Sequence, residues 1–193
     1  MLGPMTTITA ASGPSGQPDG PIPPAADVRY AIVDSVLGRM LVATTSRGVC
    51  ALALGDSDVA LEQGLRADLR RASIARDEAA LGAVAGRLVA HLAGAPLGEP
   101  PALDLVGTAF QRRVWRALLE VARGSTCSYA DLASAAGLPA SAARAVARAC
   151  AQNPVAVLVP CHRVVRGSGG LAGYRWGVER KARLLAAEGA RLA

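Results

Sequence analysis

The segment around Cys161 constrains the fold most strongly, because it places reactive side chains directly behind an apolar run. Residues 155–159 are all Val, Leu or Ala, and Pro160 is followed by Cys161, His162 and Arg163. Proline has no amide N–H and is confined to the ends and edges of strands. We therefore predict a buried strand over 155–159 that stops at Pro160 and delivers the next three side chains into a loop, where they can do chemistry.

The cysteine pattern argues against a metal site. Cys50, Cys127, Cys150 and Cys161 lie far apart, no two of them form a C-x-x-C pair, and the chain has two histidines. Zinc ligands come at much closer spacing. We expect no metal and no cofactor, and a chain of this length needs no disulfide to stabilise its core.

The start of the chain carries no targeting signal that we recognise. No residue before Arg29 is basic, and no apolar run is long enough for a signal peptide or a membrane span. These features predict a cytoplasmic protein that does not enter a membrane and whose thiols stay reduced. A reduced cysteine can act as a nucleophile.

Positive charge is concentrated in the second half of the chain. Residues 1–109 carry 8 basic and 11 acidic side chains, residues 110–193 carry 13 basic and 4 acidic ones, and the net charge is +6. Cys161 lies in the basic half. Positive charge around a reactive group favours a polyanionic partner, and nucleic acid is the first candidate. The alternative interpretation is that the arginines only form a solvated surface and bind no partner.

Three segments are expected along the chain. Residues 1–26 contain six of the twelve prolines and predict a disordered leader. Residues 27–104 predict a lobe in which two helices cover a three-stranded antiparallel sheet, because short apolar runs alternate with glycine turns. Residues 105–193 predict a mainly helical lobe. The expected strands are 28–33, 40–44 and 49–54, and the expected helices of the first lobe are 58–71 and 78–93.

Two capping boxes mark helix starts in the second lobe. Thr108 with Gln111, and Ser128 with Asp131, have the spacing in which the two side chains satisfy each other's backbone amides. The first of these helices is expected to run to about Gly124 and to bury one apolar stripe. The stripe comprises Phe110, Val114, Leu118 and Val121. Further helices are expected over 140–152 and over 177–188, the last with Lys181 on its amphipathic face.

The helix that Ser128 opens and the helix over 140–152 are separated by a glycine turn and predict a helix-turn-helix. The second of the two consists almost entirely of small residues, with Arg144 and Arg148 four positions apart. Its backbone can therefore approach a partner closely while the two arginines project beyond it. A plain alanine-rich packing helix is the alternative interpretation.

These motifs resemble the O6-methylguanine-DNA methyltransferase family, and most closely its bacterial Ada branch. The resemblance covers residues 28–188 and rests on six motifs in one order. They are 107–111 with Val114-Trp115, Ser128-Tyr129 with Leu132-Ala133, Arg144-Ala145-Val146, Asn153-Pro154, 160–164 and 173–177. The resemblance implies an α/β (α+β) fold, in which an N-terminal antiparallel-sheet lobe of ribonuclease H-like type packs on a mainly helical C-terminal lobe with a helix-turn-helix.

The function that the resemblance implies is DNA repair by direct damage reversal. Family members move the alkyl group of O6-methylguanine, and of O4-methylthymine, from duplex DNA to a cysteine, irreversibly and once per molecule. Here the acceptor would be Cys161, His162 would be the base that acts through a water, and Glu188 would orient His162. The implied partner is the minor groove of alkylated double-stranded DNA, bound by a monomer.

The resemblance also implies contacts with the DNA and with the flipped base. Arg144 would fill the gap that the flipped nucleotide leaves, Tyr129 would help to turn it out, and Tyr174 would line the base pocket. Asn153 would hold the hinge between the recognition helix and the active-site strand. The remaining implied contacts are Arg148 and Arg163.

Three other functions remain as alternatives. A non-enzymatic, alkyltransferase-like protein would bind the lesion without reacting, but relatives of that kind lack the cysteine that stands here as Cys161. A helix-turn-helix regulator would need long polar side chains to read base edges, and the helix over 140–152 has few of them. A cysteine hydrolase would need an oxyanion site, and no motif for one is evident.

Overall fold

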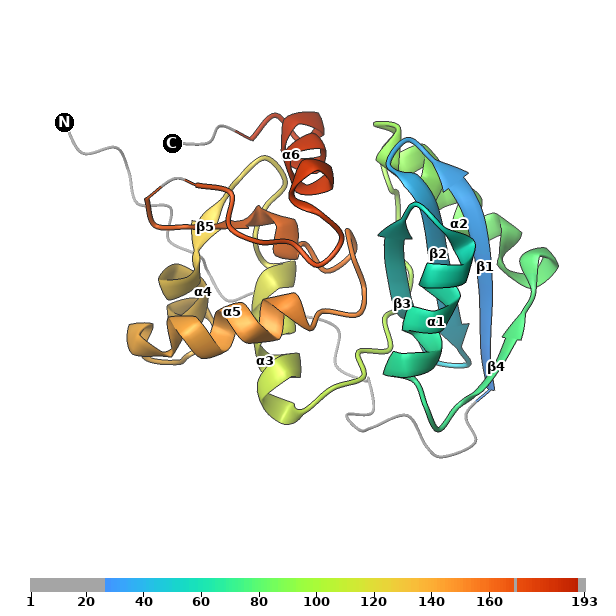
Figure 1. Ribbon diagram of the computed structural model, residues 1–193. Helices are drawn as coiled ribbons and strands as arrows, with labels where there is room; N and C mark the ends of the chain where they lie inside the picture. The colour runs from blue at the N-terminus through green and yellow to red at the C-terminus, as the bar shows by residue number, and fades with distance from the viewer. Residues whose placement is uncertain (1–26, 169, 191–193) are drawn as a thin grey trace.

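The fold consists of a sheet lobe followed by a helical lobe (Figure 1). A computed structural model describes residues 27–168 and 170–190, so the leader predicted at 1–26 lies outside the described residues. Figure 1 shows the sheet lobe in blue to green beside the helical lobe in yellow to red. One hydrophobic cluster contains side chains from both lobes, such as Leu52 and Trp115, so the lobes share part of their core.

The sheet lobe is built on four strands in the order β3-β2-β1-β4. β1 (Asp27–Ser35), β2 (Gly38–Thr45) and β3 (Gly48–Gly55) form the predicted antiparallel meander, which is confirmed. β4 (Ser73–Arg76) was not predicted, and it pairs with β1 in the parallel direction. The sheet is therefore mixed rather than wholly antiparallel.

Two helices cover opposite faces of this sheet. Successive side chains of a strand point to opposite faces, and both faces here carry buried apolar side chains. α1 (Asp58–Asp68) packs on the face that carries Tyr30 and Leu41, whereas α2 (Glu78–Leu92) packs on the face that carries Met40. α1 is shorter than the predicted 58–71, because the chain leaves the helix to form β4. α2 closely matches its prediction.

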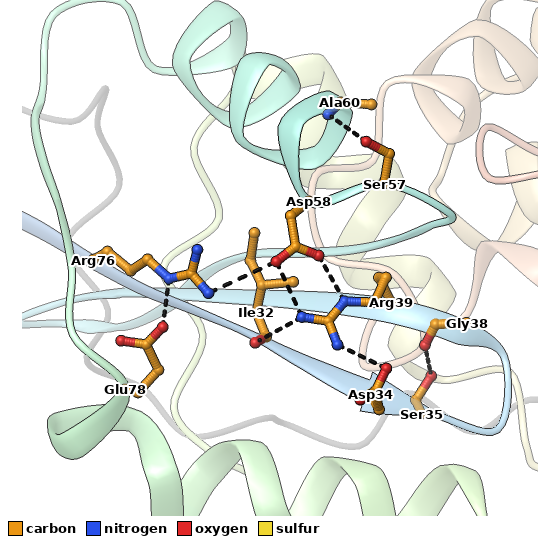
Figure 2. Close-up of polar contacts among 10 residues, drawn as sticks. All are labelled: Ile32, Asp34, Ser35, Gly38, Arg39, Ser57, Asp58, Ala60, Arg76 and Glu78. Atoms are coloured by element: carbon orange, nitrogen blue, oxygen red, sulfur yellow. Dashed lines mark hydrogen bonds and ion pairs between the residues drawn. The ribbon is translucent and has the colours of Figure 1, made fainter.

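Arg39 links the sheet to the start of α1 (Figure 2). Its Nε donates to Asp58 Oδ1 at 2.6 Å and its Nη1 donates to Asp34 Oδ1 at 2.7 Å, while Arg76 lies 3.7 Å from the second Asp58 oxygen. Hydrogen bonding to Arg39 lowers the pKa of Asp58. Asp58 is in the first turn of α1, where a negative charge also complements the helix dipole.

The helical lobe contains four α-helices and a two-stranded parallel pair. The helices are α3 (Ala109–Leu119), α4 (Tyr129–Ala135), α5 (Ala143–Ala151) and α6 (Val178–Ala187), the short strands are β5 (Cys127–Ser128) and β6 (Val164–Val165), and the 3₁₀ turns are η1 (Ala140–Ala142) and η2 (Cys161–Arg163). Both predicted capping boxes are present, at Thr108 and at Ser128. No helix among the described residues has the length and apolar content needed to cross a bilayer.

α3 differs from its prediction in two respects. The helix ends at Leu119, so Val121 lies just beyond it and Gly124 does not terminate it. Val114, Leu118 and Val121 are buried as expected, but Phe110 is 36% exposed. Phe110 lies in the first turn of α3.

The predicted strand over 155–159 is wrong. Only Val155 makes a β-bridge, to Leu52 in β3, with Leu52 N–H donating to Pro154 O at 3.0 Å and Ala156 N–H donating to Leu52 O at 2.8 Å. The chain then turns, and Val157 has a φ of +67°. The apolar run is therefore a buried turn that joins the helical lobe to the edge of β3.

Candidate active site

Asn153 organises the turn that leads to Cys161. Its side chain is fully buried, and its Oδ1 accepts from Val155 N–H at 2.9 Å. Its Nδ2 lies 2.8 Å from Val159 O, 3.3 Å from Val155 O and 3.1 Å from Cys161 Sγ. One amide thus supplies the hydrogen bonds that a strand partner would otherwise provide, and it holds the sulfur in place.

Cys161 is a buried thiol that stays protonated at neutral pH. The residue is 6% exposed, and burial raises the pKa of its thiol to about 11, although the hydrogen bond from Asn153 and the charge of Lys181 act in the opposite direction. The thiolate is the nucleophilic form of cysteine. A reaction at Cys161 therefore needs a base that removes the proton as the sulfur reacts.

His162 has the partner that a base of this kind requires. Its Nε2 lies 3.1 Å from Glu188 Oε1, and the imidazole is fully buried. An ionised carboxylate can only accept, so Nε2 carries the hydrogen and Nδ1 carries the free lone pair. Burial lowers the pKa of His162 while Glu188 raises it, and Nδ1 has no hydrogen-bond partner among the described residues.

Glu188 is held as a carboxylate by two neighbours. Arg163 donates to both of its oxygens, at 2.7 and 2.9 Å, in addition to the contact with His162. Burial alone would raise the pKa of Glu188, but hydrogen bonds from His162 and Arg163, together with the positive charge of Arg163, lower it to about 2. The carboxylate is therefore ionised wherever the protein functions near neutral pH.

Cys161 and His162 lie on the 3₁₀ turn η2, directly after Pro160. Successive side chains of a 3₁₀ helix diverge, here by about a third of a turn. The hydrogen bond of Cys161 Sγ is to Asn153, and none joins Sγ to His162 in the described structure. A water between the two side chains, which the family resemblance implies, would be needed to connect them.

Lys181 is a functional candidate that the sequence analysis missed. Its side chain is fully buried in α6, and Nζ donates to Val164 O at 2.5 Å. Burial lowers the pKa of the lysine to about 8, while the neighbouring thiols Cys161, Cys150 and Cys127 oppose that shift. No carboxylate pairs with Lys181 in the part of the chain that the structure describes. The sequence offered one signal for Lys181, because it is the single lysine in a chain with twenty arginines.

Tyr174 forms one wall of the site. Its ring packs edge-on against His162, with centroids 6.5 Å apart, and against Trp176 at 5.1 Å. Its hydroxyl is buried without a hydrogen-bond partner among the described residues. Burial, and then the neighbouring Cys161 and Glu188, raise the pKa of Tyr174 well above its usual value. An unpartnered hydroxyl beside the thiol is suited to a polar group of a ligand.

The residues predicted to contact DNA fall into two groups. Arg144 and Arg148 are exposed on α5, and the half-buried Tyr129 opens α4, with Cys161 close enough to raise its pKa after the larger effects of burial and Cys150. Arg163 is not with them. Its guanidinium binds Glu188 and Val121 O, the latter at 2.5 Å, so it is engaged inside the lobe.

α4 and α5 are held by a brace from α3. Arg113 donates to Ala136 O and, at 2.7 Å, to Gly137 O, both in the turn between the two helices. A Cβ at Gly137, where φ is +66°, would lie 2.6 Å from the Arg113 guanidinium. Helices α4 and α5 follow each other in the predicted order, and the 3₁₀ turn η1 precedes α5. That these two helices form a DNA-binding helix-turn-helix remains a prediction.

The side chains that commonly bind metal ions do not cluster in the described part of the chain. Across 27–168 and 170–190, no group of three or more His, Cys, Asp or Glu side chains could hold one. The reactive groups at the site are the Cys161 thiol, the His162 imidazole, the Glu188 carboxylate and the buried Lys181 ammonium.

Comparisons with known proteins identify the family to which the chain is similar. The family model for the 6-O-methylguanine DNA methyltransferase DNA binding domain matches residues 109–190. The chain is 49% identical over 163 residues to the bifunctional transcriptional activator/DNA repair enzyme Ada of Escherichia coli, with 83% of this chain and 45% of Ada covered. It is 38% identical over 164 residues to the methylated-DNA–protein-cysteine methyltransferase of Mycobacterium bovis, with 85% and 94% covered.

Solved structures give the same result. The O6-methylguanine methyltransferase of Mycobacterium tuberculosis superposes with a TM-score of 0.70 at 36% identity, covering 84% of this chain and 93% of that one. The same enzyme has been crystallised in complex with DNA, and that structure also matches with a TM-score of 0.70. The chain spans about half the length of Ada, but nearly the whole length of the mycobacterial proteins. The chain therefore belongs to the methylated-DNA–protein-cysteine methyltransferase family.

Proposed function

We propose that this protein repairs alkylated duplex DNA by direct reversal, transferring the alkyl group of O6-methylguanine, and also of O4-methylthymine, to Cys161. The observation that carries the proposal is a buried thiol held by Asn153 beside a neutral imidazole whose other nitrogen is bound to an ionised carboxylate. Nucleophile, base and orienting group in this arrangement are the parts of an activated cysteine.

The proposed reaction moves one proton and one alkyl group. His162 Nδ1 accepts the Cys161 proton through an intervening water, and the Glu188 carboxylate stabilises the imidazolium that forms. The Lys181 ammonium favours the developing thiolate. The sulfur then attacks the alkyl carbon, an S–C bond forms as the C–O bond breaks, and the guanine base leaves with the bonding electrons as an anion. The proton taken from the thiol passes from the imidazolium through water to the ring of this anion, which gives neutral guanine and neutral His162. The thioether product is stable, so each molecule reacts once.

The burial of Cys161 requires the damaged base to leave the DNA stack. Extrusion costs a few kcal/mol, and less for a mispaired or damaged base, which contributes to selectivity. In this proposal Tyr129 helps to turn the nucleotide out and Tyr174 lines its pocket. Arg144 occupies the vacated position in the duplex, and the small residues of α5 allow a close approach to the minor groove.

Stoichiometry tests the proposed function. A duplex carrying one radiolabelled O6-methylguanine should transfer label to the protein until one methyl is bound per molecule, and the DNA should regain an ordinary guanine. Continued release of free methyl groups with time would contradict single-turnover repair and would favour a hydrolytic enzyme.

Glu188→Gln is expected to slow transfer by about 10²-fold, because His162 loses the group that fixes its tautomer and stabilises its charge. The transfer rate falls as pH decreases through the His162 pKa, since a protonated imidazole cannot accept a proton. The carboxylate raises that pKa, so its removal should move the acidic limb of the rate profile to lower pH. Single-turnover rates across pH measure both effects. Glu179→Gln, an exposed change in the first turn of α6, should alter neither.

Arg144→Ala and Arg148→Ala are expected to have different effects. Loss of Arg144 should lower the transfer rate about tenfold or more, because nothing then occupies the gap left by the flipped nucleotide. Loss of Arg148 should weaken binding to damaged and undamaged duplexes alike and reduce the salt slope by about one. Binding titrations at several salt concentrations, with single-turnover rates, separate the two roles. Identical effects of the two changes would contradict the assignment.

A further inference from the structure

Residues 174–176 form a wall of the active site, although they lie in an irregular segment before α6. Tyr174 packs on His162, and Trp176 packs on Tyr174. Within the segment, Gly177 N–H donates to Tyr174 O at 3.1 Å. A single turn of this kind does not fix two aromatic side chains by itself, so the support for this wall must come from its surroundings.

Arg180 binds this wall and the sheet lobe at the same time. Its Nη1 donates to Trp176 O at 3.0 Å, and its Nε donates to Leu37 O, in the turn between β1 and β2, at 2.8 Å. Its Nη2 binds the carboxylate of Asp56, directly after β3. A planar guanidinium with five donors can serve three acceptors in fixed directions, which a lysine cannot do.

A second contact ties the same segment to α1. Arg175 Nη2 binds Asp68 Oδ2 at 2.5 Å, and the Arg175 guanidinium lies 5.8 Å from the centre of the Trp176 ring. The Arg175 and Asp68 side chains are 33% and 43% exposed, so this ion pair contributes little by itself. Arg180 is only 17% exposed, and its two bonds to backbone carbonyls are the stronger connection.

We propose that Arg180 is a positioning residue through which the sheet lobe holds the wall formed by Tyr174 and Trp176. Arg180 touches neither the sulfur nor the imidazole, and it acts through the Trp176 carbonyl. Small displacements of groups that position a substrate can lower a rate substantially. The inference rests on the proposed alkyl transfer, and it gives the sheet lobe a part in that reaction.

Arg183 provides a matched control. It lies on the same helix and donates to Val36 O in the same β1–β2 turn. The structure of the described residues gives it no hydrogen bond to 174–176. Arg180→Met and Arg183→Met therefore remove the same charge and one or more contacts between the lobes, but only the first removes support from the wall.

The first readout is the single-turnover transfer rate on a duplex with one O6-methylguanine. We expect Arg180→Met to lower the rate at saturating protein by about tenfold, with the Kd for an undamaged duplex unchanged within about twofold. Arg183→Met should keep the wild-type rate. Equal rates in the two variants would overturn the inference, whatever their thermal stability.

The second readout does not depend on activity. Hydrogen exchange of the peptide that contains the Gly177 amide should be faster in Arg180→Met and unchanged in Arg183→Met, because that amide reports the turn at Tyr174. If the wild type transfers no methyl but exchange differs as expected, the proposed function fails and the connection stands. If exchange is the same in both variants, the inference is wrong.

Discussion

Cys161→Ser is expected to abolish alkyl transfer, lowering the rate by at least about 10⁴-fold. A serine hydroxyl is a far weaker nucleophile than a thiolate, and neither Lys181 nor His162 can shift its acidity enough to compensate. Because serine is close to cysteine in size, the site should remain folded. Binding to a duplex with O6-methylguanine should stay within about threefold of the wild type, since phosphate contacts dominate affinity.

Cys127→Ser serves as the control for this change. Cys127 is half-buried in β5, and burial raises the pKa of its thiol to about 11, as for Cys161. It lacks the hydrogen bond from Asn153 that Cys161 has, so we expect its replacement to leave transfer intact. If Cys161→Ser retained transfer and Cys127→Ser lost it, the acceptor would have been assigned to the wrong cysteine.

Asn153→Ala is expected to lower both stability and activity. The change leaves Val155 N–H and Val159 O without their buried partner, at a cost of about 3 kcal/mol in the free energy of unfolding, since each orphaned group costs about 1–3 kcal/mol. For a chain of this size that corresponds to a fall in Tm of roughly 10 °C. The thiol also loses a hydrogen bond that lowers its pKa, so the transfer rate should fall even at temperatures where the variant is folded.

Gln152→Ala is the matched control for Asn153→Ala. Gln152 precedes Asn153 in the chain, but it is exposed and its side chain bonds to Gln111 at 3.0 Å. Its loss should change Tm by less than about 2 °C, as is usual for a surface site. Thermal unfolding followed by circular dichroism measures both variants. Equal stability of the two would show that the Asn153 network does not hold the turn.

Local signals predicted much of the fold. The capping boxes at Thr108 and Ser128 depend on residues three positions apart, and both helices begin where they indicate. The antiparallel meander follows from glycine turns between short apolar runs. β4 was missed because Ser73–Arg76 is only four residues long and mostly exposed, and its pairing with β1 connects distant parts of the chain.

Features that depend on distant contacts were not predicted. Residues 155–159 have the composition of a strand, yet they turn because Asn153 satisfies their backbone and only Val155 forms a β-bridge with β3. Lys181 lies at helical spacing among apolar residues, and nothing in the sequence shows that its Nζ is buried. Arg180 and Leu37 are 143 positions apart.

The candidate site contains residues that were named before the backbone that carries them was known. Cys161 and His162 were named from the motif after Pro160, and Glu188 from the family resemblance. The structure brings His162 and Glu188 into contact, and Asn153 hydrogen-bonds to the sulfur of Cys161. Their roles in transfer stay predictions. The sequence did not indicate that the Arg163 guanidinium binds Glu188 inside the lobe. Arg163 had been expected to contact DNA.

The measurement that tests this account most directly is peptide mass spectrometry of the wild-type protein after reaction with a duplex carrying one O6-methylguanine. The chain has four cysteines, so the modified peptide identifies the acceptor. We predict one added methyl group per molecule, located on the peptide that contains Cys161 and absent from Cys161→Ser. A methyl group on another cysteine, or tight lesion binding without any transfer, would contradict the account.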